Sequence, residues 1–144
     1  MRYFPIFIII VTLLFSSCRE DFSAELSSGK LSFSKDTIYL DTVFTNIGSS
    51  TYHFKVYNKS NKDISIPTIS LGRGESSFYR LNVDGEAGKY FENTEILAKD
   101  SLYIFIETTI DYTQVLDPIY TDSIVFSGGG NLQDVKLVTL VKDA

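Results

Sequence analysis

Two hydrophobic patterns divide the chain. Residues 4–15 form an almost continuously apolar stretch, whereas from Leu31 onward apolar side chains tend to alternate with polar ones. Alternation with a period of two is typical of β-strands that bury one face, and residues 37–44 and 52–57 show it clearly. Turns rich in Asn, Asp, Gly and Ser separate such stretches. The pattern predicts a β domain over residues 31–144.

The side chains of each predicted strand can be assigned to faces. In the strand 37–44, alternation places Ile38, Leu40, Thr42 and Phe44 together on one face. In the strand 52–57, it places Tyr52, Phe54 and Val56 on one face. His53, Lys55 and Tyr57 lie on the opposite face. Both strands are therefore expected to be half buried.

Two further segments depart from simple alternation. Ile64 and Ile66 have the opposite parity to Ile69 and Leu71, which predicts a bulge or bend near Pro67, a residue without a backbone N–H. Residues 102–106 are apolar at every position, which indicates a central strand covered on both faces.

The strand count and composition favour one fold class. Further strands are predicted at residues 31–33, 78–83, 95–98, 123–126 and 135–141, and no amphipathic helix is evident after residue 18. About seven to nine short strands at regular spacing indicate an antiparallel, immunoglobulin-like β-sandwich. Because the chain has no Trp and a single Cys, the antibody-type core signature is missing.

The N-terminus has the layout of a secretory signal peptide. Arg2 precedes the apolar residues 4–15, and the small residues Ser16 and Ser17 follow them. The apolar stretch is too short for a membrane span, which needs about 18 residues or more. The alternative is a buried N-terminal strand or helix, which the charged residues 19–21 directly after it disfavour.

The end of this segment, Leu14-Phe15-Ser16-Ser17-Cys18, resembles the lipobox of bacterial lipoproteins, although Phe15 stands where that family usually has Leu. In that family the cysteine becomes the first mature residue and carries a diacylglyceride. The resemblance implies a signal peptide at 1–17, a lipidated tether at 18–30 and lipidation of Cys18. Two or more acyl chains hold a protein stably on a membrane.

The residues after Cys18 bear on localisation. Arg19-Glu20-Asp21 resembles the acidic surface-export signal of Bacteroidetes lipoproteins, and no Asp directly follows Cys18 as in enterobacterial inner-membrane retention. This resemblance implies an outer-membrane lipoprotein of the cell envelope that is exposed at the cell surface. An acidic start to a solvated tether explains the same three residues equally well. Residues 23–30 are small and polar, which predicts a flexible linker.

A family resemblance covers most of the β domain. The segments 31–44, 54–60, 64–71 and 78–85 resemble the N-terminal module of large Bacteroidetes surface lipoproteins, in which a β-sandwich precedes a right-handed parallel β-helix. They are also similar to Hydin-like immunoglobulin domains, which are mostly scaffolding or interaction modules. This chain ends at Ala144 without a β-helix, so a stand-alone module, a truncated gene and a fragment stay open. The resemblance brings no catalytic residues.

Charge limits the range of partners. The chain has 13 Lys and Arg against 18 Asp and Glu, a net charge of −5. Nucleic-acid binding is disfavoured because a protein gains affinity for phosphates by offering cationic side chains. The basic clusters that recognise anionic lipids are also missing, so membrane contact is expected through the lipid anchor.

Few residues suggest chemistry. His53 is the only histidine, and with one cysteine it supplies no zinc site of the usual kind. Asn82, Asp84, Glu86 and residues 92–95 surround a Gly-containing loop, but their spacing does not match a calcium-binding EF-hand. Residues 128–130 lack the Lys of a phosphate loop and predict a flexible hairpin loop. We expect no metal and no cofactor.

The sequence therefore favours a non-catalytic interaction or scaffolding module on a lipid anchor. The sequence does not decide whether its partner is a protein or a glycan. Four tyrosines on strands could contribute to binding or to cross-strand packing: Tyr39, Tyr57, Tyr79 and Tyr103. One alternative is a glycan-binding accessory protein of polysaccharide uptake, which an exposed aromatic platform would favour. A small hydrolase would need a concave pair of carboxylates. A truncated remnant of a longer β-helix lipoprotein is the remaining alternative.

Metabolic labelling with palmitate tests the anchor. The wild-type chain should incorporate the label and Cys18→Ala should not, because the thiol of Cys18 is the attachment point of the diacylglyceride. Equal labelling of the two chains would show that Cys18 is not lipidated.

Overall fold

The computed structural model describes Tyr3, Ile8 and residues 25–27, 31–111 and 117–142. The predicted lipidation site Cys18 and the predicted export signal Arg19, Glu20 and Asp21 lie outside the described residues, as does most of the predicted signal peptide. Among the residues that are described, no helix is long and apolar enough to cross a membrane.

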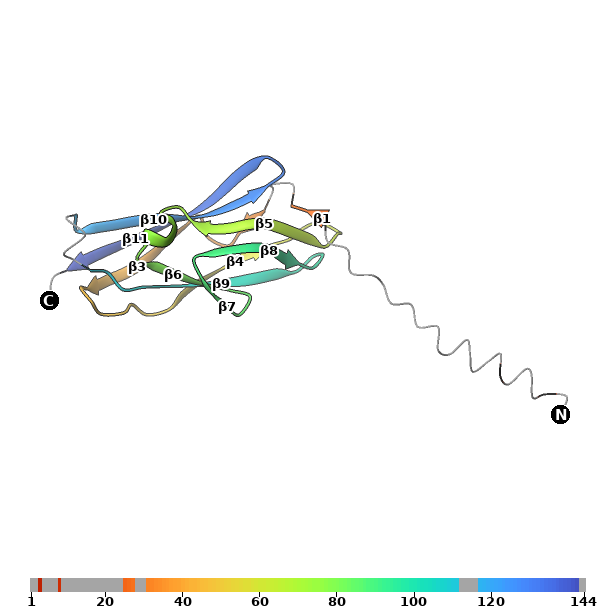
Figure 1. The fold of residues 1–144 in the computed structure, drawn as a ribbon, viewed down its shortest axis with the longest axis horizontal. Coiled ribbons are helices and arrows are strands. Elements are labelled where there is room, and N and C mark those ends of the chain that lie inside the picture. Colours follow the sequence, from red (N-terminus) through yellow and green to blue (C-terminus); the bar gives the residue numbers. More distant parts are fainter. Residues whose placement is uncertain (1–2, 4–7, 9–24, 28–30, 112–116, 143–144) are drawn as a thin grey trace.

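Two β-sheets lie one over the other and enclose the core (Figure 1). The first sheet contains β1 (Glu25–Leu26), β3 (Thr37–Phe44), β5 (Ile64–Leu71), β8 (Tyr90–Ile96), β10 (Ile119–Gly128) and β11 (Asn131–Lys142). The second contains β2 (Ser32–Phe33), β4 (Tyr52–Tyr57), β6 (Tyr79–Val83), β7 (Glu86–Gly88) and β9 (Ser101–Thr108). A short 3₁₀ helix, η1 (Gly74–Ser76), lies between β5 and β6.

The order of the strands confirms the predicted sandwich and corrects it in two details. The first sheet runs β1-β5-β10-β11-β3 with β8 also paired to β5, and the second runs β2-β4-β9-β6-β7. The pairings of β1 with β5 and of β11 with β3 are parallel, not antiparallel. Both β1 and β3 are followed by strands of the other sheet, and such crossovers permit parallel neighbours that hairpins do not. The described residues also contain two strands that were not predicted, because β1 and β7 are too short to show alternation.

The core consists of the inward-facing apolar residues of both sheets. Ile104 and Ile106 of β9 and Ile124 and Leu137 of the opposite sheet are fully buried. Burying such a side chain contributes roughly 1.5–3 kcal/mol to stability. Since the chain has only one cysteine, this packing must supply the stability that a disulfide gives many secreted domains.

One hydrogen-bond group joins the two sheets inside the core. Tyr79 of β6 is fully buried, and its hydroxyl donates to the carbonyl oxygen of Tyr120 in β10 at 3.1 Å. The same hydroxyl shares a hydrogen bond of 2.7 Å with Oγ1 of Thr139 in β11. Burial raises the pKa of Tyr79, so the hydroxyl stays protonated. The sequence left Tyr79 open between ligand binding and packing, and its complete burial assigns it to packing.

A bulge changes the faces of β3. Ile38 and Leu40 are buried as predicted, but Val43 is then buried and Phe44 is 47% exposed, opposite to the predicted parity. The register with β11 shifts between Leu40 and Val43, where β3 contains one more residue than its partner. The backbone N–H of Asp41, within the shift, donates to the hydroxyl of Tyr52 at 3.0 Å.

The predicted change of face near Pro67 is confirmed by the burial pattern of β5. Ile66 and Ile69 are both buried although they are three positions apart, a spacing that would place them on opposite faces of a regular strand. The register between β5 and β8 does not shift, because β8 changes face at the same level. There Asn93 has φ of 53°, in the left-handed region. The change of face interrupts the alternation along β8, and for this reason only residues 95–98 were predicted as a strand.

Three residues of the predicted tether belong to the sheet. Glu25 and Leu26 form β1 beside β5, and the N–H of Ser27 donates to the carbonyl oxygen of Ser65 at 2.8 Å. Glu25 also forms an exposed salt bridge of 3.0 Å with Lys62. The small, polar composition of this segment gave no sign of a strand, because its backbone hydrogen bonds, not apolar side chains, attach it.

Two hairpins are closed by two-residue turns. Asp84 and Gly85 have φ of 52° and 82°, and Gly129 and Gly130 have φ of 54° and 78°. Positive φ at both positions is what a type I′ turn requires, and it suits the twist of the flanking strands. Residues 128–130, predicted as a flexible loop, therefore form a tight turn between β10 and β11.

A buried asparagine organises the turn between β4 and β5. Asn58 is 4% exposed. Its Nδ2 donates to the carbonyl oxygens of Lys62 at 2.7 Å, Ile96 at 3.1 Å and Leu97 at 3.1 Å. Its Oδ1 accepts from the N–H of Ser60 at 3.1 Å and from its hydroxyl at 2.7 Å. This polar turn is thus bonded to the end of β8.

Removing the hydroxyl of Tyr79 tests the link between the sheets. We expect Tyr79→Phe to lower the free energy of unfolding by about 1–3 kcal/mol, because Thr139 and Tyr120 each lose a buried partner. Urea unfolding followed by circular dichroism measures the change. Tyr39→Phe, on a side chain 70% exposed, is the control and should alter stability by less than about 0.5 kcal/mol. Equal stability of the two variants would contradict this role for Tyr79.

Candidate binding surface

The outer face of the second sheet carries exposed rings. Tyr103 and Phe105 of β9 are 44% and 40% exposed, although the residues between and beside them point into the core. On β4, Lys55 lies opposite Tyr103 and His53 lies opposite Phe105. We call His53, Lys55, Tyr103 and Phe105 the aromatic face.

The rings of this face contact one another. The centroids of Tyr103 and Phe105 are 6.0 Å apart and their planes differ by 25°. The ring of His53 lies 5.5 Å from Tyr103 and 5.8 Å from Phe105. Lys55 Nζ lies 4.9 Å from the centre of the Tyr103 ring. This contact with Tyr103 raises the pKa of Lys55, so the ammonium stays charged beside the rings.

A polar group borders the aromatic face on the side of β6. Arg80 of β6 forms a salt bridge of 3.1 Å with Glu107 of β9, and the hydroxyl of Thr51 donates to Glu107 at 2.5 Å. The hydrogen bond from Thr51, and then the Arg80 guanidinium, lower the pKa of Glu107. These three side chains, with Asn82 and Phe105, line a shallow depression of about 230 Å³.

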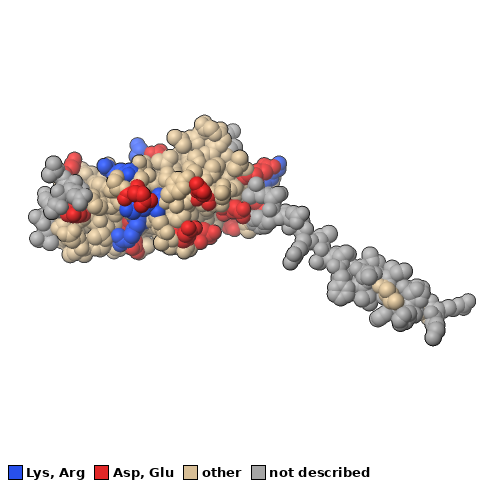
Figure 2. Space-filling view, in the orientation of Figure 1, with Lys and Arg blue, Asp and Glu red and all other residues tan. Residues whose placement is uncertain are grey.

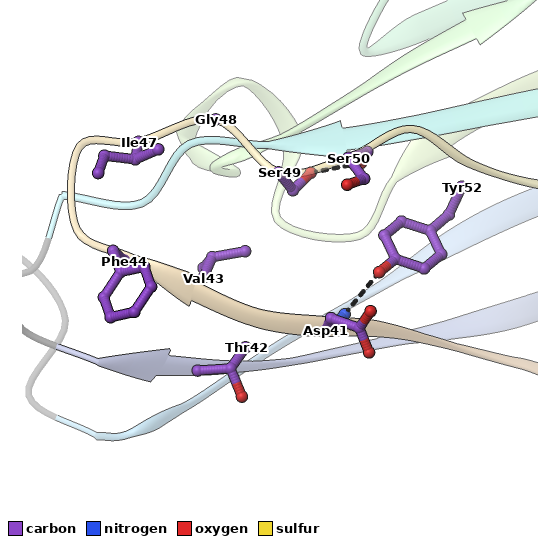
Figure 3. A pocket seen from close by; sticks show the side chains of 9 residues that line it. All are labelled: Asp41, Thr42, Val43, Phe44, Ile47, Gly48, Ser49, Ser50 and Tyr52. Atoms are coloured by element: carbon purple, nitrogen blue, oxygen red, sulfur yellow. Dashed lines mark hydrogen bonds between the residues drawn. The ribbon is translucent and has the colours of Figure 1, made fainter.

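A second depression, of about 160 Å³, lies between β3 and the segment 45–51 (Figure 3). Phe44 and Ile47 stand at one end of it, and Asp41 and Tyr52 at the other. The hydroxyl of Tyr52 points toward β3, where it accepts the hydrogen bond from the Asp41 N–H. This polar group therefore links β3 to β4, and the crevice is better explained as part of the bulged edge.

The structure separates the tyrosines that the sequence grouped. Tyr103 lies on the aromatic face, Tyr57 is partly buried on β4, Tyr39 lies on the opposite sheet, and Tyr79 is in the core. The exposed position predicted for His53 is confirmed. The exposure of Phe105 was not predicted, because an uninterrupted apolar strand indicates burial on both faces. The one available signal was that Phe105 shares the parity of Tyr103.

The residues considered for calcium do not come together. Asn82, Asp84 and Glu86 lie on the β6–β7 hairpin, whereas residues 92–95 lie on β8 of the other sheet. Within the described ranges, no three His, Cys, Asp or Glu side chains gather as a metal ion would require. Asp84 instead takes part in the hairpin turn, a position that Asp tolerates well.

Charges of both signs are mixed over the surface. Acidic side chains are spread over the face shown in Figure 2, and basic side chains gather near its middle with acidic ones among them. This mixture agrees with the net charge of −5 and gives this view no continuous cationic strip.

Comparisons with known proteins show the fold alone. No family model and no curated protein matches the chain. Part of a family 123 glycoside hydrolase from Clostridium perfringens is similar in structure, with a TM-score of 0.57, 10% identity and coverage of 80% of this chain and 27% of that one. A Porphyromonas gingivalis protein of unknown function gives a TM-score of 0.55 at 12% identity, covering 78% of this chain and 48% of the other.

The E. coli chaperone DraB gives a TM-score of 0.53 at 11% identity, covering 83% of this chain and 58% of the chaperone. The chain thus spans about a quarter to just over half the length of these three structures. With the two stacked sheets, these likenesses place the chain among the immunoglobulin-like β-sandwich domains, as the sequence predicted.

The lowered pKa of Glu107 predicts a dependence of stability on pH. Because the carboxyl is more acidic in the folded state than in the unfolded one, its contribution is present above about pH 4.3 and is lost as the pH falls through the lowered pKa. At pH 7, Glu107→Gln should lower stability by less than about 1 kcal/mol, since the pair is partly exposed.

Urea unfolding across this range measures the effect. The difference in stability between the wild-type chain and Glu107→Gln should shrink steadily as the pH falls from about 4.3 towards about 2, because protonation of Glu107 in the folded state removes its contribution. Glu95→Gln, on exposed Glu95 of β8, is the matched control. A difference between wild type and Glu107→Gln that stays constant down to that pH would contradict the prediction.

Proposed function

We propose that the chain is a non-catalytic interaction module, held on the bacterial outer membrane by lipid on Cys18 and exposed at the cell surface. The observation that carries this proposal is the aromatic face, where two stacked rings stay in solvent on a central strand of a well-packed sheet. Exposed contiguous apolar groups of this kind mark interaction sites. A lipid anchor would keep such a face near the membrane, where its partner would meet it.

The start of the fold supports a short tether. Only residues 19–24 separate Cys18 from β1, because β1 begins at Glu25. Six residues span at most about 20 Å, so the sandwich would stay close to the membrane. The end of β11 lies at the other end of the sandwich from β1 and would face away from the anchor (Figure 1).

The contacts of the only histidine support a binding role over catalysis. General-base catalysis by histidine needs a nucleophile and an orienting group within hydrogen-bond reach. His53 instead packs against the aromatic rings of Tyr103 and Phe105. We therefore interpret His53 as part of the binding surface.

Cell fractionation and thiol labelling test the proposal. The wild-type chain should sediment with the outer membrane and Cys18→Ser should be soluble, because only the lipid holds it. In a chain with acylated Cys18, Tyr103→Cys supplies the one free thiol and should react with a membrane-impermeant maleimide on intact cells. Ile104→Cys, whose position is fully buried, is the adjacent control and should not react. A soluble wild-type chain, or unlabelled Tyr103→Cys, would contradict the proposal.

A further inference from the structure

The aromatic face has the shape of a stacking platform. Tyr103 and Phe105 are two residues apart on β9, so their side chains point to the same side of the sheet. Their rings lie 6.0 Å apart and within 25° of parallel. Together they form an exposed apolar platform on the outer face of the sheet.

Hydrogen-bonding side chains lie beside this platform on β9 and the neighbouring strands. Arg80 and Glu107 are 45% and 39% exposed, so their remaining donors and acceptors are open to a ligand. Asn82 borders the same depression beside Phe105, and Lys55 lies beside Tyr103. A pyranose has two flat C–H faces and a rim of hydroxyls, which match stacked rings edged by planar polar side chains. We infer that the aromatic face binds a neutral glycan.

A protein partner fits this surface less well. The buried centres of protein interfaces are depleted of charged residues. Here Lys55 lies directly beside Tyr103, and the Arg80–Glu107 pair lies beside Phe105. Burying the platform under a protein would therefore desolvate charges next to both rings, whereas the hydroxyls of a glycan can replace water around them.

An anionic ligand is disfavoured by charge. Single-stranded nucleic acids also stack on aromatic rings, but their binding requires a positively charged groove along the backbone. The guanidinium of Arg80 is neutralised by Glu107, which leaves the ammonium of Lys55 as one positive charge beside the rings, and the chain as a whole carries a charge of −5. A single ammonium does not form a cationic groove. Binding of sulfated and uronic-acid polysaccharides is disfavoured for the same reason. Neutral sugars are therefore the favoured ligands.

This inference rests on the proposed function, since it names the ligand of the proposed surface. It is tested by native affinity electrophoresis of the full chain in mild detergent, in gels containing mixed-linkage β-glucan, xylan, mannan or dextran. The wild-type chain should be retarded by at least one of these four polysaccharides. Retardation at several polysaccharide concentrations gives an apparent Kd.

Matched variants separate stacking from other kinds of contact. Replacing both rings in Tyr103→Leu/Phe105→Leu keeps apolar side chains but removes the flat faces, and should weaken binding by about tenfold or more. Tyr103→Phe keeps the ring and should bind within about threefold of wild type. Tyr39→Leu removes an exposed tyrosine from the opposite sheet and should leave binding unchanged. Urea midpoints equal to that of the wild type confirm that the variants are folded.

Three outcomes would overturn the inference. If none of the four polysaccharides retards the wild-type chain, a neutral-glycan site of this kind is excluded. The fractionation and labelling experiments would still test the membrane-anchored module independently. Retardation that survives in the double Leu variant would exclude stacking on these rings. Binding weakened as much by Tyr39→Leu as by the double variant would place the site elsewhere.

Discussion

The hydroxyl of Tyr79 fixes how the two sheets sit on each other. Apolar packing between sheets is strong but has no direction, so it tolerates small shifts of one sheet over the other. A buried hydroxyl that must find partners permits only one arrangement. Tyr79 of β6 reaches Thr139 and the carbonyl oxygen of Tyr120 in the opposite sheet, and its ring stacks on that of Tyr120. In a chain with one cysteine, this group takes the place that a disulfide between sheets holds in other sandwiches.

The edges of the first sheet are irregular, which has a physical benefit. A straight edge strand presents unpaired backbone groups that can pair with another chain. The edge strand β3 carries a bulge, and the hydroxyl of Tyr52 accepts the Asp41 N–H within it. The edge strand β8 bends at Asn93 and exposes the carboxylates of Glu92 and Glu95. Both devices discourage edge-to-edge pairing between copies of the sandwich.

The proposed binding surface depends on the core beneath it. β9 is the central strand of its sheet, with β4 and β6 on its two sides. Leu102, Ile104 and Ile106 hold it in the core, and alternation then fixes the outward direction of Tyr103 and Phe105. A binding site on paired strands needs little ordering when a ligand arrives, so less binding free energy is lost. The weak cation–π and ring contacts of Lys55 and His53 add further order.

Local patterns in the sequence were sufficient for the fold class, the strands with clear alternation and the change of face at Pro67. These features depend on which face of each strand is buried in the core. The alternation of apolar and polar residues along the sequence shows this directly. The same patterns gave the predicted signal peptide and Cys18, which rest on the sequence alone. The bulge in β3, the strand at Glu25 and the burial of Tyr79 were not predictable, because each is decided by a partner far along the chain. Exposure of Phe105 belongs to this group: an apolar strand can be covered on one face or two, and only the position of its sheet at the surface leaves the ring in solvent.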